Sequence, residues 1–227
     1  METFVLIHGA WHGSWCWQKV KPLLENAGHK VVAPDLPGHG ENRQKATEEV
    51  TLLDYVHCVI EVLDQQSGSV ILVGHSMGGM VISQVAEYRP DKIKKLVYLT
   101  AFLLKDGKSM HTEDEPPPEP FSMSDADLKE FFYGDCSDAD FRWAKALLVP
   151  QPRAPVTTPL HITDDNYGRV PRVYIECLQD GAIIPTWQKQ MYTDIPCERV
   201  ITMNTSHSPF ISTPEDLTRN LLSLIPS

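Results

Sequence analysis

Residues 70–79 read Val-Ile-Leu-Val-Gly-His-Ser-Met-Gly-Gly, an apolar run that leads into the pattern Gly-x-Ser-x-Gly. This pattern carries a nucleophilic serine when it joins a strand to a helix through a sharp turn. Small residues at positions 74 and 78 let the two backbones approach each other, and the helix N-terminus offers free N–H groups and a positive dipole end. The stretch therefore predicts Ser76 as a nucleophile at the carboxyl end of a parallel sheet.

Similar short apolar runs recur along the chain, and longer stretches with a helical pattern separate most of them. The expected strands are Phe4–Ile7, Lys30–Ala33, Val70–Val73, Lys95–Leu99, Val173–Cys177 and Arg199–Met203. The expected helices are Trp15–Ala27, Thr51–Gln65, Met77–Tyr88, Pro185–Tyr192 and Pro214–Leu224. Strands that alternate with helices indicate the α/β class, with a mostly parallel central sheet flanked by helices on both faces.

One segment, residues 103–168, breaks this alternation. It holds 13 of the 30 acidic residues, 6 of the 20 basic residues and 8 of the 18 prolines, including Pro116-Pro117-Pro118. Two short helices are expected near 125–133 and 138–148, because each begins with Ser-Asp-Ala-Asp, a serine cap followed by acids in the first turn. We expect a small cap inserted at 103–168 into a core formed by 1–102 and 169–227.

The overall composition restricts the class of function. The chain has 227 residues and a formal charge of −10, which disfavours binding to nucleic acid or to an anionic membrane surface. Its five cysteines form no Cys-x-x-Cys pair, and neither a metal site nor a disulfide framework is expected. No signal peptide and no membrane-spanning run is recognised, so a cytoplasmic location is expected.

A serine hydroxyl needs an adjacent base, and the base needs an acid that orients it. The expected order along the chain is Ser, then Asp or Glu, then His. His207 lies just beyond the last expected strand and before the final helix, and Asp180 lies three residues beyond the preceding strand. Glu176 lies within that strand and Asp194 follows a helix, so both are poorer candidates for the acid.

The remaining site residues follow from their positions next to these three. The loop after the first strand and the residue after the nucleophile supply oxyanion-hole N–H groups in this arrangement, which predicts Ala10 and Met77 as the donors. Substrate contacts are expected from side chains beside the site and from aromatic residues of the cap. The candidates are Trp11, His12, His75, Phe131, Phe132 and Trp143. For the last three, the alternative is that they only pack the cap helices.

Several motifs together resemble those of one family. They are Val-Leu-Ile-His-Gly-Ala-Trp-His-Gly-Ser-Trp-Cys-Trp at 5–17, Ala-Pro-Asp-Leu-Pro-Gly-His-Gly at 33–40, the Gly-His-Ser-Met-Gly-Gly turn at 74–79, Pro171–Asp180, and His-Ser-Pro-Phe at 207–210. The chain is similar to plant methylesterases, hydroxynitrile lyases and their bacterial esterase relatives over nearly its whole length, least so in the cap. The resemblance implies an α/β-hydrolase fold, hydrolysis of small-molecule esters without a metal or cofactor, and frequently a homodimer.

Two positions depart from the lyase pattern within that family. Lyases carry lysine directly after the catalytic histidine, where this chain has Ser208, and Thr or Asn after the first-strand histidine, where it has Gly9. Serine rather than aspartate at position 76 also argues against haloalkane dehalogenase chemistry. Hydrolysis of small neutral carboxylic esters is the preferred interpretation. A lyase or other C–C cleaving enzyme, and a slow-turnover small-molecule receptor, stay as alternatives.

Overall fold

A computed structural model describes residues 1–112, 114 and 122–225. The predicted Pro116-Pro117-Pro118 run of the cap lies outside these residues. The strands are β1 (Thr3–Ile7), β2 (Lys30–Val32), β3 (Val70–His75), β4 (Ile93–Leu99), β5 (Arg172–Cys177) and β6 (Arg199–Met203). They form one sheet in the order β2-β1-β3-β4-β5-β6, and every neighbouring pair is parallel. The predicted α/β fold with a parallel sheet is therefore confirmed.

Helices cover both faces of this sheet. The α-helices are α1 (Val20–Asn26), α2 (Leu52–Asp64), α3 (Gly78–Tyr88), α4 (Asp125–Tyr133), α5 (Asp138–Lys145), α6 (Arg153–Thr157), α7 (Pro185–Asp194), α8 (Pro209–Ser212) and α9 (Pro214–Leu222). Short 3₁₀ turns are η1 (Ser14–Trp17), η2 (Thr47–Glu49), η3 (Pro90–Lys92) and η5 (Tyr167–Arg169).

The alternation of side chains along β1 explains the two layers of the core. Phe4 and Leu6 belong to a buried cluster with α1 and α9, whereas Val5 and Ile7 belong to a second cluster with α2 and α3. Successive side chains of a strand point to opposite faces, so a continuous apolar run is the pattern of a strand that is buried on both sides. The sheet is thus a rigid centre from whose carboxyl edge the functional loops extend.

The expected helix Trp15–Ala27 is wrong as a single element. Residues Ser14–Trp17 form the 3₁₀ turn η1, and α1 begins only at Val20. Pro22 supplies the reason, because proline has no N–H and its ring clashes with the carbonyl four residues earlier, which restricts it to the first turn of a helix. Pro22 is the third residue of α1, so an α-helix cannot extend back to Trp15.

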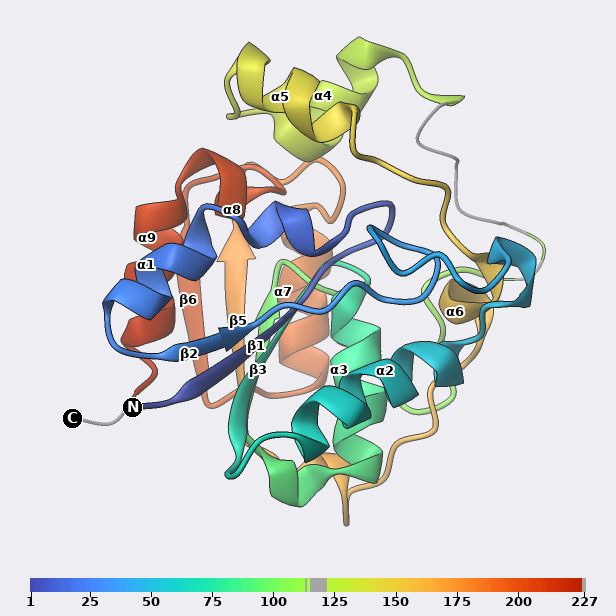
Figure 1. Ribbon diagram of the computed structural model, residues 1–227, viewed down its shortest axis with the longest axis vertical. Coiled ribbons are helices and arrows are strands. Elements are labelled where there is room, and N and C mark those ends of the chain that lie inside the picture. Colours follow the sequence, from blue (N-terminus) through green and yellow to red (C-terminus); the bar gives the residue numbers. More distant parts are fainter. Residues whose placement is uncertain (113, 115–121, 226–227) are drawn as a thin grey trace.

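The first two helices of the segment 103–168 stand above the carboxyl ends of the strands, toward which β5 points in Figure 1. Ser124 and Ser137 cap α4 and α5 by accepting the N–H groups of Asp127 and Asp140, as the repeated tetrapeptide predicts. Helix α5 ends at Lys145 rather than near residue 148, and the chain then turns to the core. Helix α6 lies against α2. The division into a 103–168 cap and a two-part core stays a prediction.

Candidate active site

Ser76 lies on the turn between β3 and α3 with φ = 52°, a left-handed conformation that non-glycine residues rarely adopt. The turn is tight enough to require glycine at two neighbouring positions. A Cβ on Gly74 would lie 2.5 Å from the carbonyl oxygen of Gly78, and one on Gly78 would lie 2.8 Å from that of Ile7. The carbonyl oxygen of Ser76 accepts the N–H groups of Gly79 and Phe102, each at 3.0 Å. The strained turn is thereby fixed by its surroundings.

Asp180 and His207 form a buried pair. The Nδ1–H group of His207 donates to Oδ2 of Asp180 at 2.7 Å, and both side chains are almost completely shielded from solvent. The other oxygen of the carboxylate accepts the N–H groups of Ala182 and Ile183 at 2.7 and 2.9 Å. Thr100, directly after β4, donates its hydroxyl to Oδ2. Because the carboxylate is held by four donors, it can fix both the orientation and the tautomer of the imidazole.

The two alternative acids are engaged elsewhere. Glu176, on β5, accepts the hydroxyl groups of Tyr192, in α7, and of Thr202, on β6. Asp194 lies at the end of α7, where it pairs with Lys105 at 3.0 Å. Within the described residues, neither carboxylate bonds to a histidine, so the geometry favours Asp180.

Ser76 and His207 line one cavity of about 440 Å³, together with Ala10. The described part of the chain holds no direct hydrogen bond between Ser76 and His207, and it holds no partner for the backbone N–H groups of Ala10 and Met77. Catalytic hydrogen bonds are often long in unliganded sites and tighten when substrate binds. Two N–H groups without a partner beside the serine have the character of oxyanion donors, and their assignment stays a prediction.

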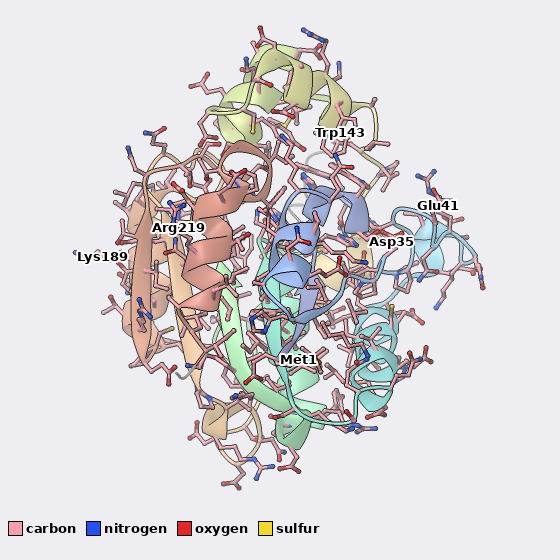
Figure 2. The ribbon with its side chains drawn as sticks, turned by 60° about the vertical axis from the view of Figure 1, so that its left-hand side comes forward. Met1, Asp35, Glu41, Trp143, Lys189 and Arg219 are labelled. Carbon is pink, nitrogen blue, oxygen red and sulfur yellow. The ribbon has the colours of Figure 1, made fainter. Side chains whose placement is uncertain are left out.

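The cavity is largely apolar. Its lining includes five of the candidates for substrate contacts, whose role in binding stays a prediction: Trp11, His12, His75, Phe131 and Phe132. Trp143 is not among the described lining residues. Its ring packs edge-on against Trp15 with the centroids 5.2 Å apart, and Figure 2 shows it where the cap meets the core. The ring thus packs α5 on η1, and a substrate contact of Trp143 stays a prediction.

Both ring nitrogens of His12 form hydrogen bonds with the protein. Its Nδ1–H donates to the carbonyl oxygen of Ala10 at 2.7 Å, and its Nε2 accepts the hydroxyl of Tyr133, in α4, at 2.7 Å. Burial lowers the pKa of His12 to about 3 and holds the pKa of His75 well below its usual range. Both rings are neutral at neutral pH, so they line the cavity without adding a charge to it.

Some residues of this site are absent from the sequence-based candidates. Thr100 and Tyr133 contact the predicted site residues, and Met110, Met123 and Trp187 line the cavity. Thr100 directly follows β4, and Asp180 follows the neighbouring strand β5. Because both residues lie just beyond adjacent strands, their contact could have been predicted from the sequence. The other residues come from the cap segment and from α7, whose placement over the cavity is not encoded in any local pattern.

A parallel sheet with serine on a strand-to-helix turn, and a His–Asp pair at the same edge, defines the α/β-hydrolase class. Residues 4–220 match the model of the "Alpha/beta hydrolase family". The chain belongs to this family, in its methylesterase-like group. Within the described residues, no helix is long and apolar enough to cross a membrane, and no group of three metal-ligating side chains is found.

Relatives of known sequence or structure cover nearly the whole chain. It is 36% identical over 251 residues to "Putative methylesterase 11, chloroplastic" of Arabidopsis thaliana. The aligned region covers 99% of this chain but 64% of that protein. It is 33% identical over 254 residues to Salicylic acid-binding protein 2 of Nicotiana tabacum, covering 98% and 96% of the two chains. The structure of a pyrethroid hydrolase from Sphingobium faniae JZ-2 superposes with a TM-score of 0.87 at 32% identity, covering 98% and 96%.

Proposed function

We propose that the protein is a serine carboxylesterase that hydrolyses small neutral carboxylic esters through an acyl-enzyme. One observation carries the proposal: Ser76, on its strained turn, and His207, which is bound to buried Asp180, line the same apolar cavity. The names of the relatives, which include methylesterases and a pyrethroid hydrolase, support ester chemistry.

The mechanism follows from these contacts. As Oγ of Ser76 attacks the ester carbonyl, Nε2 of His207 takes its proton, and the N–H groups of Ala10 and Met77 stabilise the oxyanion. His207 then gives the proton to the departing alkoxide, and the alcohol leaves. Water, activated by His207, attacks the acyl-enzyme and restores the serine as the acid departs. Asp180 stays ionised throughout and stabilises the imidazolium.

The cavity favours a neutral substrate. Among the described residues that line it, none is Asp, Glu, Lys or Arg, and burial keeps His12 and His75 uncharged. A carboxylate brought into this space would lose its hydration without gaining a lysine or arginine as partner. Five aromatic side chains face the cavity instead, and its volume suits an ester carrying a ring or a branched apolar group. These residues are Trp11, Phe102, Phe131, Phe132 and Trp187.

Two positions disfavour the lyase alternative. A Cβ on Gly9 would lie 2.9 Å from both Nδ1 of His75 and Cβ of Ser76, so the Thr or Asn of lyases requires these neighbours to move. Ser208, at the position of the lyase lysine, is fully buried and is not among the described lining residues of the cavity. No cation is therefore available at that position to hold a departing cyanide.

A substrate panel tests the proposal. Wild-type protein and Ser76→Ala would be assayed with p-nitrophenyl esters of increasing acyl length and with mandelonitrile. We expect the wild type to hydrolyse the short neutral esters, the variant to be inactive, and mandelonitrile to stay intact. Cyanide release without ester hydrolysis would instead support a lyase, and binding of ester without turnover would support a receptor.

A further inference from the structure

An acidic side chain of the cap, Asp135, contacts the loop that carries His207. Asp135 follows α4 by two positions. Its Oδ2 accepts the backbone N–H of Ser206 at 3.1 Å, and its Oδ1 accepts the hydroxyl of the same serine. Ser206 is buried and directly precedes His207. A carboxylate that binds two donors of one residue fixes the rotation of that residue as well as its position.

The end of α4 packs closely against this loop. A Cβ on Gly134 would lie 3.6 Å from the Cβ of Ser206, within ordinary contact distance. The ring of Phe132 lies edge-on to the ring of His207 with the centroids 5.4 Å apart. Both residues belong to the same end of the cap as Asp135, so the docking of this end and the placement of His207 depend on each other.

The core holds His207 from two other directions. Its carbonyl oxygen accepts the Nε2–H of His75 at 2.9 Å, and its Nδ1–H is bound by Asp180. Those contacts fix the residue at its carbonyl and at its ring. On the N-terminal side of His207, the core holds Thr205, whose carbonyl oxygen accepts the N–H of Gln179 at 2.9 Å. Asp135 holds Ser206, the residue between Thr205 and His207, and this support comes from the cap.

We propose that Asp135 is a positioning residue of the reaction: by binding Ser206, it sets His207 where its Nε2 can receive the proton of Ser76. The inference rests on the proposed role of His207 as the base. This role explains why an exposed position of the cap carries a carboxylate, because Asp135 forms no ion pair within the described residues and binds Ser206 instead. It also makes hydrolysis sensitive to the docking of the cap even when the lining of the cavity is unchanged.

Three variants separate hydrogen bonding from charge. Asp135→Ala removes both contacts with Ser206. Asp135→Asn keeps them, because the amide oxygen can accept the N–H while the amide group donates to the hydroxyl. Ser206→Ala removes one contact and keeps the other. Asp140→Asn is the matched control, because Asp140 joins the same cap to the core through Lys19, at 2.8 Å, without touching the loop of His207.

Each variant would be assayed for kcat and KM on p-nitrophenyl acetate, and the low-field Nδ1–H proton resonance of His207 would be recorded. For Asp135→Ala we expect kcat to fall about tenfold with KM nearly unchanged, the size of a lost hydrogen bond to a charged group. Its resonance should broaden or shift. Ser206→Ala should lie between Asp135→Ala and wild type. Asp135→Asn should restore most of the activity, and Asp140→Asn should resemble wild type.

Several outcomes would overturn the inference. They are wild-type kcat and resonance in Asp135→Ala, an equal loss in Asp140→Asn, or a loss in Asp135→Asn as large as in Asp135→Ala. If Asp135→Ala fails to fold, Ser206→Ala alone decides, and wild-type kcat in it counts against the proposal. Ser76→Ala and His207→Ala are run alongside. Activity retained in these two variants would refute the proposed function itself, whatever Asp135 does.

Discussion

Replacing Asp180 by asparagine tests the His–Asp pair, and the structure dictates how the new amide must lie. One carboxylate oxygen accepts two backbone N–H groups, at 2.7 and 2.9 Å. An NH₂ group in that place would face two donors, so the amide oxygen of the Asp180→Asn variant must occupy it. The NH₂ group is then directed at Nδ1 of His207 and at the hydroxyl of Thr100, which occupy the other side of the carboxylate.

This orientation reverses the hydrogen bond to His207. The NH₂ group donates to Nδ1, which must therefore lose its proton, and the proton moves to Nε2. The ring can then no longer accept a proton from Ser76. A wrong tautomer of this kind costs about 10⁴-fold in kcat in a serine protease triad. The same loss here corresponds to about 5.4 kcal/mol of transition-state stabilisation. KM should change little, because the side chains that line the cavity are untouched.

Steady-state hydrolysis of p-nitrophenyl acetate by purified Asp180→Asn measures this loss, with circular dichroism to confirm folding. Asp194→Asn is the control, since Asp194 is exposed on α7 and its partners within the described residues, Lys105 and Gln190, do not line the cavity. It should be nearly silent. The reasoning is refuted if Asp180→Asn keeps more than about a tenth of wild-type kcat, because a member of a working triad cannot be so dispensable.

Three further predictions concern stability and selectivity. Tyr133→Phe leaves Nε2 of His12 buried without a donor and should lower the free energy of unfolding by about 1–3 kcal/mol in urea titrations; Tyr88→Phe, at an exposed position, should be silent. Burial lowers the pKa of His8 to about 4 and of His12 to about 3, so the unfolded state binds more protons below the ordinary pKa of 6.5. The contribution of the two histidines to the free energy of unfolding should therefore be fully present above pH 6.5 and fall by roughly 1 kcal/mol per histidine for each pH unit below it. A free energy of unfolding that stays constant down to about pH 5 would contradict this. The acidic segment 103–168, together with the apolar cavity, should make an ester with a free carboxylate a poorer substrate than its neutral match. Added salt should raise kcat/KM for the anionic ester and leave that for the neutral ester unchanged. Equal rates for both esters at low salt would exclude an effect of the cap's charge.

The sheet and the positions of the triad candidates could be predicted because local patterns encode them. Apolar runs indicate strands that are buried on both faces, and the carboxyl ends of parallel strands meet at one edge. Ser76, Asp180 and His207 each follow such a run, so their proximity follows from the topology. The helix caps at Ser124 and Ser137 were equally local and equally predictable.

Contacts between distant segments were not predictable in this way. Asp135 reaches Ser206 across 71 positions of sequence, and Tyr133 reaches His12 across 121. Such pairs depend on how the cap sits over the sheet, and no periodic pattern encodes that placement. Trp143 is a further example, because no local pattern indicates that its ring packs against Trp15 on the core.

Covalent labelling tests the central claim most directly. The protein would be treated with a fluorophosphonate that mimics the tetrahedral intermediate, and the modified residue would be identified by peptide mass spectrometry. We predict one adduct, on Ser76, that forms in parallel with the loss of esterase activity. The adduct should be absent from Ser76→Ala, whose kcat should fall roughly 10³-fold or more. Labelling of another residue, or an Ser76→Ala variant that still hydrolyses esters at a tenth of the wild-type rate, would contradict the account.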